Sequence, residues 1–73
     1  MSNETQTAFD VLVLGMTDAT VIQAIESHAD IGADQGLAEH LHVASQLITA
    51  LDNMYGEGSY HKYKTQGILP HEQ

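Results

Sequence analysis

The sequence contains no cysteine, no arginine and no tryptophan, and it has one proline in 73 residues. Without cysteine the chain has no disulfide and no thiolate chemistry, so a reducing compartment is allowed. The chain also lacks any stretch of about 18 apolar residues that would cross a bilayer. Its polar start, MSNETQT, lacks the basic region of a signal peptide. These absences predict a soluble, cytoplasmic protein without a membrane segment.

Positive charge is nearly absent as well. Ten carboxylates face only Lys62 and Lys64, and nine of the ten lie between Glu4 and Glu57, a span with no lysine or arginine. The formal net charge of −8 repels phosphate backbones and anionic lipids, so direct binding to nucleic acid or to membranes is not expected. Such a surface either docks on a basic protein or only keeps a small protein in solution.

The chain is short for a self-sufficient domain. A protein of 73 residues buries only about 60% of its unfolded surface and is marginally stable alone. Hydrophobic residues make up 42% of the sequence, which is enough to form a core and is unlike a disordered chain. We therefore expect one domain that associates with itself, as a homo-oligomer, or with another protein.

The stretch FDVLVLGMTDATVIQAI, residues 9–25, allows two interpretations. An apolar, β-branched run that stops at a glycine is typical of a nucleotide-binding strand, but the glycine fingerprint is incomplete and no other β-rich run precedes the tail. In one straight helix, the two apolar sets of this region would point nearly opposite ways: Phe9, Leu12, Val13 and Met16 against Val21, Ile22, Ile25 and Ala29. A break near residues 15–17 reconciles them. We predict a first helix over about 4–15, with a strand as the alternative.

Two further helices are predicted after this break. The segment 18–29 has apolar residues on one face, Thr17 or Asp18 as its cap, and Gly32 as its exit. A longer helix is predicted over about 33–55, closed by the glycines of YGEGS. The short link DIGAD between them favours antiparallel neighbours, so the two helices form a helical hairpin.

The longer helix carries an apolar seam, whose members are alternately four and three residues apart. This spacing is typical of one helix face. Leu47 and Ala50 widen the stripe on its two flanks. Because so small a chain has few partners for so wide a stripe, we predict that the seam forms an interface with the other helix or with a second chain. Its members are Leu37, Leu41, Ala44, Ile48, Leu51 and Tyr55.

Residues 59–73, SYHKYKTQGILPHEQ, differ from the rest because they hold both lysines, the proline and two of the three tyrosines. Gly67 and Pro70 argue against a helix to the end, so a non-helical C-terminal tail is predicted after a helical domain of residues 1–58. The tail either drapes over the surface or acts as a contact arm, with its lysines on carboxylates of a sister subunit. The predicted partner contacts of the tail and of the solvent side of the long helix are Glu39, Asp52, Tyr60, Lys62, Tyr63 and Lys64.

Metal sites are weakly indicated. Glu39 and His42 have the Glu-x-x-His spacing of carboxylate-bridged di-iron bundles, and Glu26 or Asp30 would face them across a hairpin. The seam, however, places Glu39 and His42 on the far side of their helix. His40 borders the seam and fits a helix contact instead. We expect no metal and no cofactor.

Catalysis has still less support, since Ser27 beside His28 and Ser45 near His42 both lack the setting of an activated nucleophile. The leading hypothesis is a small acidic, non-enzymatic, all-α protein, a helical hairpin or three-helix unit, that self-associates and binds another protein as an inhibitor or adaptor. One alternative is an oligomeric module that captures a small ligand between subunits. Another is a metal-binding helical assembly. In composition alone, the chain resembles small phage-encoded accessory proteins.

Overall fold

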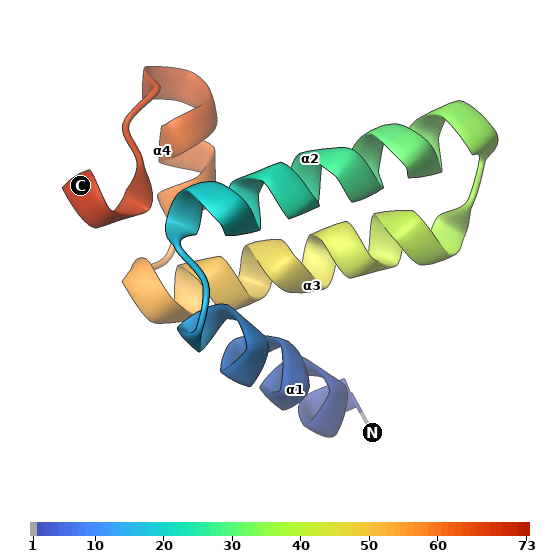
Figure 1. Cartoon of the computed structure of the whole chain (residues 1–73), viewed down its shortest axis with the longest axis horizontal. Helices are drawn as coiled ribbons and strands as arrows, with labels where there is room; N and C mark the ends of the chain where they lie inside the picture. The colour runs from blue at the N-terminus through green and yellow to red at the C-terminus, as the bar shows by residue number, and fades with distance from the viewer. Residues whose placement is uncertain (1) are drawn as a thin grey trace.

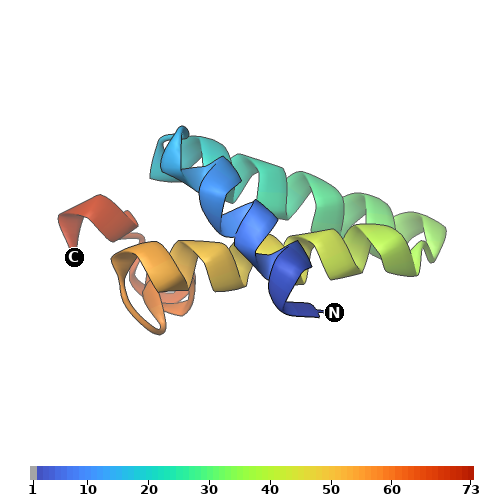
Figure 2. The same cartoon turned by 90° about the horizontal axis from the view of Figure 1, so that it is seen from below.

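The computed structural model describes the backbone of residues 2–73 and the surroundings of the side chains from residue 5 onward, and it is all-helical over that range. α2 and α3 lie antiparallel and side by side, α1 crosses α3 obliquely, and α4 lies at the end of the hairpin where α2 begins (Figure 1 and Figure 2). None of these helices combines the length and hydropathy needed to span a bilayer. The elements are α1 (Ser2–Leu14), α2 (Asp18–Gln35), α3 (Ala38–Tyr55), α4 (Ser59–Gln66) and a 3₁₀ turn, η1 (Pro70–Glu72).

The opening stretch is helical, so the strand alternative is wrong and the predicted break is confirmed. α1 ends at Leu14, and the chain turns before α2 begins at Asp18. Thr17 caps α2 as predicted: its backbone is extended and its Oγ1 accepts a hydrogen bond from the Thr20 amide at 3.2 Å. In one straight helix the apolar residues of these two segments would point apart. The break between α1 and α2 lets both sets face a common core.

The hairpin turn lies later than predicted. α2 continues through Gly32 to Gln35, Gly36 closes it in the left-handed conformation with φ 66°, and α3 starts at Ala38. Gly32 is buried within α2, where a Cβ would lie 2.7 Å from Cγ of Leu41 and 3.1 Å from the Leu41 amide nitrogen. The missing side chain therefore lets α2 and α3 approach closely, and Gly32 does not end the helix.

The core lies between α1, α2 and α3 and takes up much of the predicted seam. Ala44 and Leu51 are buried within the single chain, Ile48 and Tyr55 are partly buried, and only Leu37 and Leu41 remain exposed. From Ala44 to Tyr55 the seam therefore packs against its own chain. Leu47 and Ala50, which were predicted to lie on the flanks of the stripe, belong to the centre of the core. The buried apolar residues are Val13, Val21, Ile22, Ile25, Ala44, Leu47, Ala50 and Leu51.

The prediction of a non-helical tail is wrong, because residues 59–66 form α4. Asp52 of α3 caps this helix: its two carboxylate oxygens accept hydrogen bonds from the amides of Gly58 and Tyr60, each at 3.2 Å. Gly67 ends α4 with φ 72°, as its position in the sequence indicated. The polar composition of the segment hid a helix that is held by a cap six to eight residues earlier in the chain.

Candidate protein-binding groove

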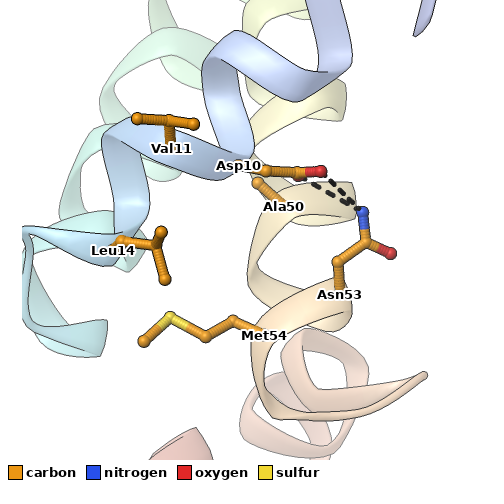
Figure 3. A pocket seen from close by; sticks show the side chains of 6 residues that line it. All are labelled: Asp10, Val11, Leu14, Ala50, Asn53 and Met54. Atoms are coloured by element: carbon orange, nitrogen blue, oxygen red, sulfur yellow. Dashed lines mark hydrogen bonds between the residues drawn. The ribbon is translucent and has the colours of Figure 1, made fainter.

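A shallow groove of about 230 Å³ lies between α1 and α3, and we name it the α1–α3 groove. Buried Ala50 contributes to it from α3, while Leu14 and Met54 extend toward one another from the two helices (Figure 3). Away from them, the Asn53 amide donates to both carboxylate oxygens of Asp10, at 3.2 and 3.4 Å. The full lining is Asp10, Val11, Leu14, Ala50, Asn53 and Met54.

α1 exposes three large apolar side chains, of which Val11 and Leu14 line the groove. Val11 is 62% exposed, Leu12 54% and Leu14 65%. α1 packs mainly against α3 and turns Phe9, Val13 and Met16 toward the core. One helix with a single main neighbour cannot cover apolar residues on all its sides, so three of them face solvent. Contiguous exposed apolar residues on a small protein are typical of an interaction surface.

Carboxylates border the groove. Asp10 is one of its lining residues, and the Gln6 amide donates to Asp10 Oδ1 at 3.1 Å, which fixes this carboxylate on α1. A second depression shares Asn53 with the groove and is lined further along by Asp52 and Glu57. The two lysines of the chain lie elsewhere, on α4. The groove thus combines an apolar surface with an acidic border.

Sequence reasoning did not single out Val11 or Leu14. It grouped Leu12 with Phe9, Val13 and Met16 on one face, and the structure contradicts this grouping because Leu12 is exposed. A signal was present in FDVLVLGM, where apolar residues occur all around the helix and exceed what one neighbour can bury.

The predicted contact arm instead docks on its own chain. Tyr60 and Tyr63 pack against the core with their ring centres 6.4 Å apart. Burial raises the pKa of the Tyr60 phenol above its ordinary value, and the nearby Lys64 cation offsets only part of this rise. Lys64 Nζ lies 3.3 Å from Glu26 Oε2 of α2, an exposed ion pair of small energetic weight. Lys62 is exposed. The tyrosines and Lys64 therefore fasten α4 to the body.

The two carboxylates predicted on the solvent side of α3 differ in setting. Glu39 is exposed in the first turn of α3, as expected. Asp52 is partly buried and caps α4, so its placement on the solvent side is wrong. Of these two carboxylates, Glu39 can contact a partner without loss of a hydrogen bond that holds the fold, whereas Asp52 cannot.

The residues considered for metal binding and catalysis do not assemble into one centre. Among the described residues, no three of histidine, aspartate and glutamate lie together as a set that would hold a metal ion. His42, Ser27 and Ser45 are exposed on their helices. His28 and His40, by contrast, face each other across α2 and α3 with their Nδ1 atoms 3.0 Å apart. The later position of the hairpin turn hid this pair from sequence reasoning.

A second long-range contact ties the C-terminus to α2. Buried Asp18 accepts hydrogen bonds from the Ala19 amide at 2.8 Å, the His71 amide at 2.9 Å and the His71 ring at 2.7 Å. Burial would raise the pKa of Asp18, but these hydrogen bonds outweigh it and hold the pKa below its ordinary value of 3.8. The same contact raises the pKa of His71 above 6.5. Separated by 53 residues, the pair leaves no local signal in the sequence.

This contact predicts a pH window. Because the pKa of Asp18 is lowered, its contribution is present above pH 3.8 and is lost as the pH falls through the lower value. Because the pKa of His71 is raised, its contribution is full below pH 6.5 and is lost as the pH rises through the raised value. We expect the stability advantage of the native chain over His71→Gln, measured by urea unfolding, to be present at about pH 5.5 and to shrink by about pH 8.5.

Ring proton NMR provides the control for this window. The pKa of the His71 ring should be higher in the native chain than in Asp18→Asn, which lacks the carboxylate that raises it. An unchanged pKa of His71 in Asp18→Asn would contradict the contact between Asp18 and His71.

Comparisons with known proteins provide no relative from which to transfer a role. No protein-family model matches the chain, and neither the curated proteins nor the solved structures include a significant match.

Proposed function

We propose that this chain is a non-enzymatic protein-binding module that accepts a cationic, amphipathic helix of another protein in the α1–α3 groove. The observation that carries the proposal is the exposure of Val11 and Leu14 beside Met54, at a site bordered by carboxylates. An amphipathic helix laid into an apolar groove is a recurring mode of recognition. Binding of this kind suits an inhibitor or adaptor, which acts by occupying a surface of its partner.

The size of the groove supports a protein partner over a small ligand. Pockets that hold small molecules typically enclose about 300–1,000 Å³ and are lined mainly by apolar side chains. This groove has about 230 Å³ and is open to solvent along α1, and the adjoining depression of about 500 Å³ is lined by polar and acidic residues and a glycine. The tyrosine and lysine segment, which would have closed a ligand site between subunits, is engaged by the core and by Glu26. A binding partner therefore has to supply a surface of its own.

Charge supports a cationic partner over a second copy of the chain. Each copy carries a formal charge of −8, and the groove border adds Asp10 and Glu57 to any contact made there. Two such grooves face to face would bring like charges together, whereas lysine or arginine on an incoming helix would pair with them. Burial of Val11 and Leu14 would supply the apolar part of the binding free energy.

A designed peptide tests this proposal. The probe is an 18-residue helix with a leucine seam flanked by lysines, and its control is a scrambled peptide of the same composition that lacks the seam. We expect the probe to bind more tightly than the scrambled peptide, to shift the NMR signals of the α1–α3 groove, and to bind less tightly as salt rises, because screening weakens the charge contacts.

A matched pair of variants locates the contact. Leu14→Asp should weaken binding of the probe by about tenfold or more, since it removes apolar contact and places a charge in the groove. Leu37→Asp adds the same charge at an exposed leucine beside the hairpin turn and should leave the affinity unchanged. Equal affinity for both peptides, or equal effects of the two variants, would contradict the proposal. A concentration-dependent dimer of the free chain that Leu14→Asp dissolves would assign the groove to a second copy.

A further inference from the structure

The facing histidines of α2 and α3 form a site that shares no residue with the α1–α3 groove. His28 and His40 are both partly buried, and their Nδ1 atoms are 3.0 Å apart. Their ring centres are 5.2 Å apart and their planes meet at 26°. That separation is close to the largest that a 3.0 Å contact between the nitrogens permits, so the two Nδ1 atoms point at one another. A hydrogen bond joins them, with the proton on one nitrogen and a lone pair on the other.

We propose that His28 and His40 bind a divalent transition metal of the Ni²⁺ and Cu²⁺ class, which replaces the shared proton and bridges α2 and α3. Imidazole nitrogen is a preferred ligand of these metals. A metal about 2.0–2.1 Å from each nitrogen spans 3.0 Å at a ligand–metal–ligand angle of roughly 91–97°. That angle is the one between neighbouring ligands in octahedral or square-planar coordination, the geometry typical of Ni²⁺ and Cu²⁺.

The rings need only a local change to take up the metal. Both nitrogens must present lone pairs, so the proton moves to Nε2 on the ring that carried it at Nδ1. Each ring then turns about its χ2 torsion, which has a broad energy minimum in histidine, until both lone pairs meet at one point. Because no third protein ligand completes a set among the described residues, water occupies the remaining positions of the metal. The partial exposure of both rings gives that water access.

The backbone around the pair is already fixed. One turn after His28, Gly32 packs directly against Leu41, which follows His40 in the sequence. This close approach of α2 and α3 sets the spacing of the two ring-bearing backbones without the metal. A bound metal therefore acts as a cross-link between two helices that are already in place, and its stabilisation of the fold grows with the logarithm of the metal concentration above the dissociation constant.

Thermal unfolding with Ni²⁺ as the probe tests the site, on the full chain without an added histidine tag at about pH 7.5. At a Ni²⁺ concentration a hundred times the dissociation constant, the folding equilibrium constant should rise by about a hundredfold, which raises the midpoint temperature by several degrees or more. Mg²⁺ at the same concentration should produce no such rise, because it prefers oxygen ligands. Lowering the pH should weaken the Ni²⁺ effect, because protons compete with the metal for the same nitrogens.

Four variants separate this site from the other histidines and the acidic surface. His28→Gln and His40→Gln should each lose the Ni²⁺-dependent rise, whatever their own stability, whereas His42→Gln and His61→Gln should retain it because both of those rings are exposed elsewhere. Ni²⁺ that holds two imidazoles and completes its shell with water is octahedral and paramagnetic, so it should also broaden the amide signals of residues 28 and 40 first. A rise that survives in His28→Gln, or no rise in the native chain at millimolar Ni²⁺, would overturn the proposal.

Discussion

Replacing Leu51 by alanine is expected to remove a large share of the stability of this protein. Leu51 has no exposed surface and lies in the core between the helices. Truncation of a fully buried leucine costs about 2–5 kcal/mol, because the lost apolar contacts leave a cavity that the surroundings fill only in part. A domain of this size has about 4–11 kcal/mol in total. Thermal unfolding should therefore show a midpoint temperature lower by about 10–30 °C.

Leu12→Ala is the matched control for this loss. It makes the same chemical change on α1, where the side chain is 54% exposed, so its cost should stay within about 0.5 kcal/mol. Equal losses in the two variants would place α1 and α3 in a different arrangement from the one described, with Leu12 inside. Both variants keep the net charge, so the comparison isolates burial.

The helices were predictable where periodic apolar residues agree with a local cap. Thr17 lies directly before α2, and its hydroxyl accepts a hydrogen bond from the Thr20 amide in the first turn. The whole cap lies within four consecutive residues, so the sequence alone predicts it. The roles of the glycines were ambiguous because they depend on packing between residues that are not neighbours in the sequence. Gly32 and Gly36 carry the same local signal for a helix end, and only the packing of Leu41 against Gly32 makes one of them an interior residue.

α4 and the C-terminal tether could not be predicted, because their supports lie far away in the sequence. α4 depends on Asp52 and on tyrosines that reach the core, and η1 depends on Asp18 at a separation of 53 residues. The groove was partly predictable. Apolar residues occur all around α1, which indicates that some of them are not covered by the neighbouring helix. Which residues line it depends on how α1 crosses α3, and periodicity carries no information on crossing.

Reversal of the charge at Asp52 is expected to unfold α4, whereas the same reversal at Glu39 is expected to leave it intact. α4 has eight residues, too few to be stable in isolation, and Asp52 satisfies two amides at its start. Asp52→Lys removes both hydrogen bonds at a cost of about 0.5–2 kcal/mol. It also sets a cation at the positive end of the helix. Backbone chemical shifts of residues 59–66 should become those of a random coil.

Two comparisons assign the cause of this loss. Glu39→Lys makes the same change in charge at an exposed position of α3, so residues 59–66 should keep their helical shifts. Asp52→Asn removes the charge and one of the two acceptor oxygens, since its amide nitrogen cannot accept a hydrogen bond, but it keeps the other acceptor and sets no cation at the helix end, so α4 should be weakened less than in Asp52→Lys. Helical shifts retained in Asp52→Lys would mean that the packing of Tyr60 and Tyr63 against the core holds α4 without its cap. Complete loss of α4 in Asp52→Asn as well would mean that one hydrogen bond is not enough and that α4 requires the whole carboxylate cap, with both acceptors and the negative charge.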